Sequence, residues 1–170
     1  MEHILVMGIA GAGKTTLGRA LALRLAALFV DGDDHHSEDA RAKMAAGVAL
    51  SDQDRAPWLV ALASMLKDSP DRVVLACSAL TPAYRAVLGV GLCVYLEILA
   101  DLARTRLSQR QDHFAGPALL PTQIATLVPP TTDEGFALLV VPAHLPLTAQ
   151  IDQVCDWLAA RTEGNEATNL

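Results

Sequence analysis

The sequence predicts an α/β fold, in which a five-stranded parallel sheet has helices on both faces. Short apolar runs alternate with helical patterns along the chain, and this alternation calls for a parallel sheet with right-handed crossovers. The run Val73–Cys77 is apolar throughout, as expected of a parallel strand that is covered on both faces. A glycine-rich loop joins the first apolar run to the first helical pattern, in the strand–loop–helix order of such folds.

The expected strands are the apolar runs, which glycine, proline or polar residues separate from the helices. In chain order they are His3–Met7, Leu28–Asp31, Val73–Cys77, Cys93–Ile98 and Ala137–Val141. The expected helices lie between these strands or follow the last one. They are Lys14–Ala27, Ser37–Ala46, Asp54–Lys67, Pro82–Leu88, Asp101–Gln109 and Leu147–Ala160.

Two insertions interrupt the alternation within what we expect to be one domain, residues 1–161. The first covers about residues 33–58, and the second, which holds several proline and glycine residues, covers about 110–130. Ligands of an open parallel sheet bind beyond the carboxyl ends of its strands, the edge that both insertions leave or approach. We therefore expect a substrate-binding segment at 33–58 and a closing lid at 110–130. The polar tail 162–170 is expected to be disordered.

The composition argues against several classes of protein. The net charge is −6 and no basic stripe is present, so nucleic acid is not an expected partner. No apolar stretch approaches the roughly 20 residues of a spanning helix, so we expect no membrane segment. The cysteines Cys77, Cys93 and Cys155 are widely separated and lack metal-binding spacing, which favours reduced thiols in the cytoplasm.

The strongest functional signal is an eight-residue loop with the pattern G-x-x-x-x-G-K-[ST]. It consists of Gly8, Ile9, Ala10, Gly11, Ala12, Gly13, Lys14 and Thr15, and Thr16 follows it. Its glycines let successive backbone N–H groups turn inward and form an anion-binding nest, toward which the positive end of the helix points. We expect Lys14 to reach the β- and γ-phosphates and the Thr15 hydroxyl to bind Mg²⁺. The loop therefore predicts that the protein binds a nucleoside triphosphate.

Two carboxylates at the end of the second strand indicate metal and proton chemistry. Asp31 is a candidate to hold Mg²⁺ through its water shell, and Asp33 is a candidate to accept the proton of an attacking hydroxyl. His36 is a candidate to hydrogen-bond a substrate hydroxyl, whereas we expect His35 to be solvated. The alternative interpretation of this segment is an acidic turn that caps the next helix.

The sequence lacks two features of switch-type GTPases and motor-type ATPases. Such proteins place a metal-binding carboxylate at the end of an apolar strand, but here Val73–Cys77 is followed by Ser78. A guanine-reading Asn-Lys-x-Asp motif is impossible, because the asparagines are Asn165 and Asn169 in the tail. The acidic residues after the second strand instead favour an enzyme that phosphorylates a small hydroxyl compound.

Arg106 and Arg110 lie four residues apart on one face of an expected helix, at the base of the predicted lid. Arginines in such a place can stack on adenine or hold the transferring phosphoryl group as charge spreads over its oxygens. Both are therefore candidate nucleotide-binding residues, and Arg106 is with Lys14 and Asp33 a candidate catalytic residue. The alternative is a solvated basic face.

Several further segments resemble the gluconate kinases. The most specific is Asp54-Arg55-Ala56-Pro57-Trp58-Leu59, a stretch that is not general to phosphate-loop kinases. The others are Asp31-Gly32-Asp33 with His36, Lys43-Met44 with Gly47 and Leu50, Cys77-Ser78-Ala79-Leu80 with Tyr84-Arg85, and Arg110 with His113-Phe114. The resemblance runs in order from Ile4 to about Trp157.

This resemblance implies a phosphate-loop kinase fold like that of the nucleoside monophosphate and shikimate kinases. It also implies transfer of the ATP γ-phosphate to the 6-hydroxyl of D-gluconate, with Mg²⁺, in a cytoplasmic and often homodimeric enzyme. Gluconate carries a carboxylate, for which Arg55 and Arg85 are the candidates because arginine pairs with carboxylates in a bidentate manner. Lys43 is expected to assist.

The hydroxyl groups of gluconate are assigned to other residues. Asp33 and His36 are expected to face them, and His113 of the lid is a further candidate substrate contact. Trp58 is expected to pack the substrate-binding helix against the sheet rather than to stack on the ligand.

The chain departs from the usual pattern of the gluconate kinases in three places. Thr81 stands where the family usually has Lys, Asp112 stands where it usually has Gly, and Pro121 with Thr122 precedes Gln123 where Ser-Gln is usual. These differences concern the lid and one phosphate contact, and they leave the phosphate loop and the segment 31–59 intact. The alternatives are a kinase of the same fold that acts on shikimate or another sugar acid, and a nucleotide-binding regulator.

Overall fold

One parallel sheet organises the chain in the computed structural model, which describes residues 2–109 and 117–167. Its strands lie in the order β2-β3-β1-β4-β5. They are β1 (Ile4–Met7), β2 (Leu28–Asp31), β3 (Val73–Ala76), β4 (Leu92–Glu97) and β5 (Ala137–Pro142). Neighbouring strands are parallel, with Val6 of β1 paired to Ala76 on one side and Val94 on the other. The predicted fold class is confirmed.

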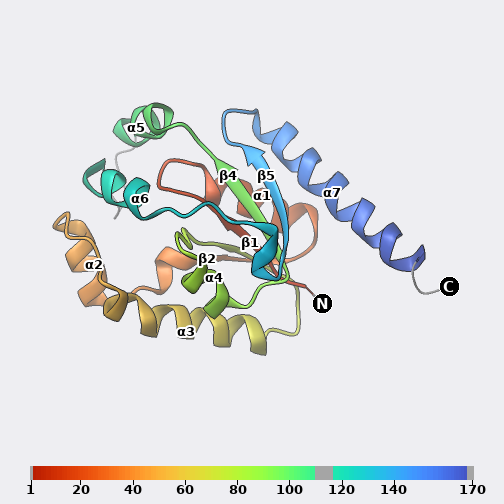
Figure 1. Cartoon of the computed structure of the whole chain (residues 1–170), viewed down its shortest axis with the longest axis horizontal. Helices are drawn as coiled ribbons and strands as arrows, with labels where there is room; N and C mark the ends of the chain where they lie inside the picture. The colour runs from red at the N-terminus through yellow and green to blue at the C-terminus, as the bar shows by residue number, and fades with distance from the viewer. Residues whose placement is uncertain (1, 110–116, 168–170) are drawn as a thin grey trace.

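Helices cover both faces of the sheet (Figure 1). They are α1 (Lys14–Arg24), α2 (Glu38–Ala45), α3 (Asp52–Asp68), α4 (Pro82–Leu88), α5 (Ala100–Ser108), α6 (Leu120–Thr126) and α7 (Leu147–Ala167). Three short 3₁₀ helices cover Gly32–His35, Pro117–Leu119 and Thr132–Glu134. Most bounds agree with the predicted ranges to within two residues. α6, which lies inside the expected lid, was not predicted from the sequence.

The two faces of the sheet form separate cores because side chains alternate along each strand. Leu5 of β1 packs with α3 and α4, through residues that include Leu62 and Leu88. Ile4, on the other face of β1, packs with α1 and α7 through residues that include Leu17. Both faces of the central strands are therefore buried, which explains why their sequences are continuously apolar.

The sheet brings the chemistry-bearing segments to one end of the molecule. The phosphate loop follows β1, Asp31 ends β2 and Ser78 follows β3, so all three lie at the carboxyl ends of neighbouring strands. Figure 1 shows α2, α5 and α6 gathered at this same end, away from the N-terminus. The fold thus places the first insertion and the α6 segment beside the phosphate loop.

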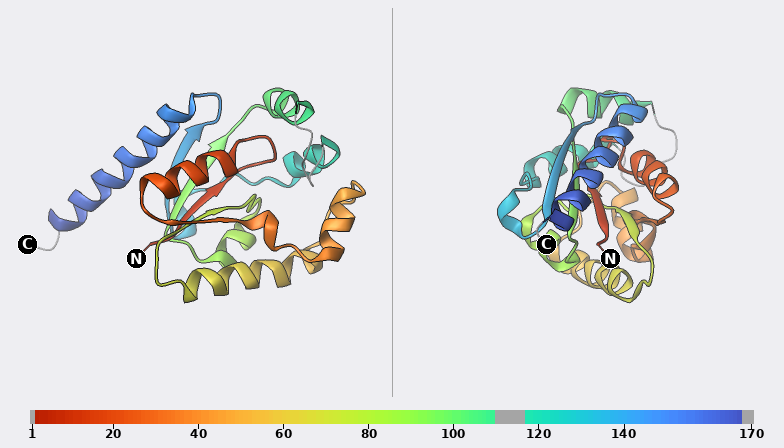
Figure 2. Two further views of the ribbon diagram at one scale, coloured as in Figure 1. Left: turned by 180° about the vertical axis from the view of Figure 1, so that it is seen from behind. Right: turned by 90° about the vertical axis from the view of Figure 1, so that its right-hand side faces the viewer.

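The C-terminal helix corrects one prediction. We expected a helix to end at Ala160 and a disordered tail to begin at Thr162, but α7 continues to Ala167. Figure 2 shows its last turns extending beyond the sheet. The sequence loses its apolar periodicity in this part while the helix continues, so that loss did not mark the end of the helix. None of the helices in the described ranges is long and apolar enough to cross a membrane.

Candidate active site

The phosphate loop takes a backbone path that requires glycine at two of its positions. Gly8 and Gly11 have φ angles of 147° and 83°, which side chains rarely adopt. A Cβ atom would lie 2.8 Å from the Leu96 carbonyl oxygen at Gly8, and 2.8 Å from the Ala103 carbonyl oxygen at Gly11. α1 begins at Lys14 with no side chain capping its first N–H groups. The start of α1 therefore offers backbone donors to an anion.

Thr15 and Asp31 meet beside this loop. The Thr15 hydroxyl donates to Oδ2 of Asp31 at 2.8 Å, and the other oxygen of Asp31 accepts the backbone N–H of Asp33 at 3.2 Å. The two residues predicted to bind the metal thus lie side by side and present oxygen atoms. Hard cations such as Mg²⁺ prefer oxygen ligands and retain several waters, so this donor set fits Mg²⁺.

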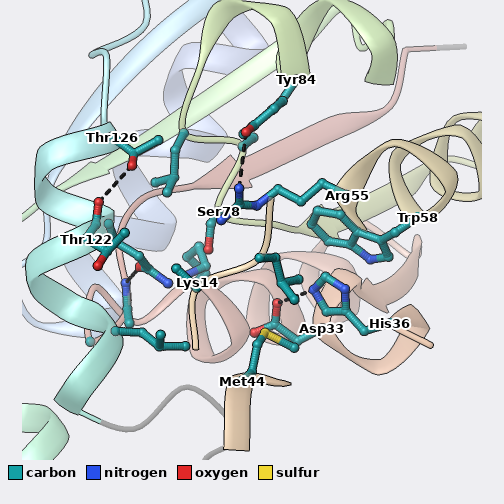
Figure 3. A pocket seen from close by; sticks show the side chains of 18 of the residues that line it. Lys14, Asp33, His36, Met44, Arg55, Trp58, Ser78, Tyr84, Thr122 and Thr126 are labelled. Carbon is teal, nitrogen blue, oxygen red and sulfur yellow. Dashed lines mark hydrogen bonds and ion pairs between the residues drawn. The ribbon is translucent and has the colours of Figure 1, made fainter. Parts of the chain in front are cut away.

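A cavity adjoins the phosphate loop on its Asp33 side (Figure 3). Its walls combine the loop with side chains from α2, α3, the segment after β3 and α6. The lining residues are Ala10, Gly11, Gly13, Lys14, Thr15, Asp33, His36, Met44, Ala49, Leu50, Arg55, Trp58, Ser78, Ala79, Leu80, Tyr84, Leu119, Thr122, Gln123 and Thr126. This cavity joins a triphosphate-binding loop to a carboxylate that can accept a proton.

His36 forms part of the cavity wall and is held by Trp58. The two rings stack with centroids 4.1 Å apart, and the Trp58 indole N–H donates to the Gly32 carbonyl oxygen at 2.7 Å. Trp58 therefore packs α3 against the end of β2, in agreement with its expected role. Burial lowers the pKa of His36 although Asp33 opposes this shift, so a neutral imidazole lies with Nε2 4.0 Å from Oδ1 of Asp33.

Arg55 lies in the cavity wall and is supported by Tyr84. Its Nη1 donates to the Tyr84 hydroxyl at 3.3 Å, and its guanidinium carbon lies 5.6 Å from the centre of the Tyr84 ring. The Tyr84 hydroxyl in turn donates to the carboxylate of Asp52. The Arg55 side chain is 19% exposed. The Arg55 guanidinium is therefore a partly buried cation that an anionic ligand in the cavity can reach.

Arg85 corrects the sequence prediction, because it is 1% exposed and does not line the cavity. Its Nε and Nη2 each donate to the Glu134 carboxylate at 2.7 Å. Its Nη1 donates to the carbonyl oxygens of Ala79 and Val128 at 2.9 and 3.1 Å. A guanidinium engaged on three sides cannot also take a substrate carboxylate. The prediction that Arg85 binds substrate is wrong, and Arg85 instead joins α4 to the segment before β5.

Lys43 is a second correction. Its ammonium group pairs with Oδ1 of Asp54 at 2.7 Å and lies outside the cavity lining. Asp54 also accepts from the backbone and hydroxyl of Ser51, the residue that caps α3. These contacts lower the pKa of Asp54 to about 2, with the Lys43 hydrogen bond the largest cause. Lys43 therefore ties α2 to the start of α3 rather than assisting at the substrate.

Arg106 contacts the phosphate loop outside the cavity that Asp33 lines. Its Nη1 donates to the carbonyl oxygens of Gly11 and Ala12 at 3.4 and 3.3 Å, and its Nη2 donates to that of Ala143 at 2.8 Å. It borders a second hollow, lined by Gly11, Ala12, Gly13, Thr16, Arg106, Leu145, Leu147 and Gln150. Of the two roles considered for Arg106, this position favours stacking on adenine over holding the phosphoryl group. Its assignment as a catalytic residue is not supported, because Arg106 does not line the cavity that holds Asp33.

Two predicted site residues are not described by the structure, and several residues that were not predicted line the cavity. Arg110 and His113 lie outside the described residues. Polar residues that the sequence analysis did not assign also line the cavity, namely Ser78, Tyr84, Thr122, Gln123 and Thr126. Ser78 and Tyr84 belong to segments that carried the family resemblance, so a signal for them existed. Thr122 and Gln123 stand where the family usually has Ser-Gln, so a signal existed for them too, whereas Thr126 had none because α6 was not predicted.

The chain matches known proteins along most of its length. The model of the family described as Shikimate kinase matches residues 10–123. A mouse protein named "Probable gluconokinase" is 43% identical, over 87% of this chain and 94% of that protein. The "Thermoresistant gluconokinase" of Escherichia coli K12 is 37% identical, over 95% of this chain and 91% of that protein. The crystal structure of a gluconokinase from Sinorhizobium meliloti 1021 superposes with a TM-score of 0.87 at 32% identity, covering 99% and 98% of the two chains.

Proposed function

The chain belongs to the gluconokinase family, and on this premise we propose that it transfers the γ-phosphoryl group of ATP to the 6-hydroxyl of D-gluconate. The observation that carries the proposal is the single cavity in which Lys14 of the phosphate loop, the carboxylate of Asp33 and the cation of Arg55 come together. These three groups match the three needs of the reaction, which are a phosphate site, a proton acceptor and a partner for the carboxylate of the substrate.

The donor half of the proposed site is built around the phosphate loop. The inward N–H groups of the loop and the start of α1 hold the β-phosphate, and Lys14 is assigned to neutralise charge on the transferring group. Thr15 and Asp31 are the residues that would hold Mg²⁺, which when bound supplies positive charge to the phosphate oxygens. The nucleotide base and sugar are assigned to the second hollow, beside Arg106 and Gln150.

The acceptor half orients the 6-hydroxyl and receives its proton. Asp33 accepts the proton as the hydroxyl oxygen forms its bond to phosphorus and the bond from phosphorus to the ADP oxygen breaks. His36 is neutral, so it can hydrogen-bond a hydroxyl group of the substrate without competing with Arg55 for the carboxylate. Arg55 holds the carboxylate, and that contact fixes which end of the linear acid faces Asp33. Closure of the cavity excludes water, which would otherwise hydrolyse ATP.

Two other functions compete with this proposal. The family model that matches 10–123 carries the name Shikimate kinase, so shikimate or another sugar acid is the nearest alternative acceptor. A nucleotide-binding regulator is the second alternative, but the charged and hydrogen-bonding side chains that line the cavity beside the loop favour an enzyme with a small acceptor.

A coupled assay of ADP release across a panel of acids tests the proposal. We expect ATP turnover to depend on D-gluconate and to be far slower with shikimate or no acceptor. Faster turnover with shikimate than with gluconate would assign a different acceptor. Equal ATP hydrolysis with and without every acid would favour the regulator.

A further inference from the structure

A hydrogen bond between residues 113 positions apart links α6 to the phosphate loop. The backbone N–H of Ala10, third residue of the loop, donates to Oε1 of Gln123 at 2.7 Å. Three residues before Gln123, the fully buried Leu120 packs in a cluster that includes Ile9 and Ala10. α6 is therefore fixed against the loop by an apolar contact and a polar one, and the Gln123 carboxamide has a defined position.

The Ala10 contact also fixes which way the carboxamide faces. A backbone N–H can only donate, so the oxygen of Gln123 must be the atom that faces Ala10. The NH₂ group is then the other arm of the carboxamide, and within the described residues it has no hydrogen-bond partner in the protein. Gln123 lines the same cavity as Lys14 and Asp33. A neutral hydrogen-bond donor thus belongs to the wall of the cavity that Lys14 and Asp33 also line.

We propose that the NH₂ group of Gln123 donates a hydrogen bond to the γ-phosphoryl group of ATP and positions it for transfer, an inference that rests on the kinase function proposed above. Gln123 neither gives up nor takes a proton. The bond from phosphorus to the ADP oxygen breaks, the bond to the acceptor oxygen forms, and Asp33 receives the proton. A donor on α6 complements Lys14, because each contacts the phosphoryl group from a different element, and transfer then requires α6 to be in place.

This proposal differs from a purely structural role in what it says about ADP. If Gln123 only satisfied the Ala10 N–H, its loss would change the loop for ADP and ATP alike. If its NH₂ group contacts the γ-phosphoryl group, its loss weakens binding of the triphosphate and spares the diphosphate. Removing one hydrogen bond to a charged group corresponds to about a tenfold change in affinity.

Calorimetric binding of Mg²⁺–ADP and of a non-hydrolysable ATP analogue to two variants separates these roles. Gln123→Glu keeps an oxygen that can accept from the Ala10 N–H but replaces the NH₂ donor with a negatively charged oxygen. Gln123→Ala removes both the acceptor and the donor. We expect both variants to bind the analogue about tenfold or more weakly, with Glu the weaker of the two. Gln123→Glu keeps an acceptor for Ala10 and should bind ADP within about twofold of wild type, whereas Gln123→Ala should lose more affinity for the analogue than for ADP. Gln153→Glu makes the same charge change on the exposed surface of α7 and should alter neither affinity.

Equal losses of ADP and analogue affinity, or no loss of either, would overturn the proposal. The measurement contains no acceptor, so it does not depend on which acid is phosphorylated. Absence of gluconate-dependent turnover in the wild type, together with selective loss of analogue binding in the variants, would reject gluconate and retain the role of Gln123. Gluconate-dependent turnover of the wild type, together with unchanged analogue binding by the variants, would retain gluconate and reject the role of Gln123.

Discussion

The donor and acceptor halves of the proposed site differ in which groups of the chain form them. The donor half is mostly backbone, because glycine conformations and the start of α1 shape the phosphate loop within eight consecutive residues. The acceptor half is mostly side chains, which α3, α6 and the segments after β2 and β3 contribute separately. A site made of local backbone is encoded in a short motif. A site made of distant side chains depends on the packing of the elements that carry them.

The largest expected effect comes from removing the proposed proton acceptor, which should impair the acceptor half of the site and spare the donor half. Asp33→Asn keeps the shape of the side chain but removes its basicity, so we expect kcat with gluconate to fall about 10²- to 10⁴-fold. The donor half is unaltered, so the affinity for ATP should stay nearly the same. Steady-state kinetics with a direct measurement of ATP binding checks this prediction. Near-normal turnover would remove Asp33 from the proposed chemistry.

The second prediction concerns Arg85, which the sequence presented, equally with Arg55, as a candidate to bind the substrate carboxylate. Arg85→Met leaves Glu134 without its buried partner, so we expect the free energy of unfolding to fall by about 3–5 kcal/mol. The protein that remains folded should keep its KM for gluconate, because Arg85 does not reach the cavity. Denaturant unfolding and steady-state kinetics on the same preparation test both statements. A large rise in KM without loss of stability would restore Arg85 to the substrate site.

The third prediction tests the proposed contact between Arg55 and the substrate carboxylate in the acceptor half. Arg55→Lys keeps the charge but loses the planar pair of donors, so we expect the KM for gluconate to rise about tenfold or more. The KM for ATP should change little, because Arg55 does not line the hollow assigned to the nucleotide base and sugar. Kinetics with each substrate varied in turn measures the two values. An equal rise in both would mean that Arg55 acts on the loop or on folding.

The smallest effect concerns stability against pH at His36. Burial lowers the pKa of His36 in the folded protein below its value of 6.5 in the unfolded chain, while Asp33 raises it and Arg55 and Arg41 lower it. Stability from the neutral imidazole is therefore present above pH 6.5 and is lost as pH falls through the lower, folded pKa. Thermal unfolding from pH 8 to pH 5 should show a shallower acid decline for His36→Asn than for the wild type. Parallel curves would show that His36 is not the titrating group.

Local signals in the sequence carried much of the fold and the donor half. The alternation of apolar runs and helical patterns predicted the five strands, and the bounds of β2 and α4 were correct. α1 ended earlier than predicted because Ala26 takes a left-handed conformation, with φ of 49°, that apolar periodicity does not reveal. α6 was not predicted, because the proline and glycine residues near it are typical of a loop. In each case the local pattern lacked the backbone detail that decided the boundary.

The sequence by itself determined the phosphate loop and the placement of Asp31 and Asp33 after the neighbouring strand, because each depends on residues that are close together in the chain. Only the tertiary structure decided that Arg55 reaches the cavity while Arg85 is buried against Glu134. It alone decided that Gln123 meets Ala10. Motif spacing records which residues follow one another along a strand or helix. Which distant side chains meet depends on how the helices pack on the sheet, and that is set by the whole core.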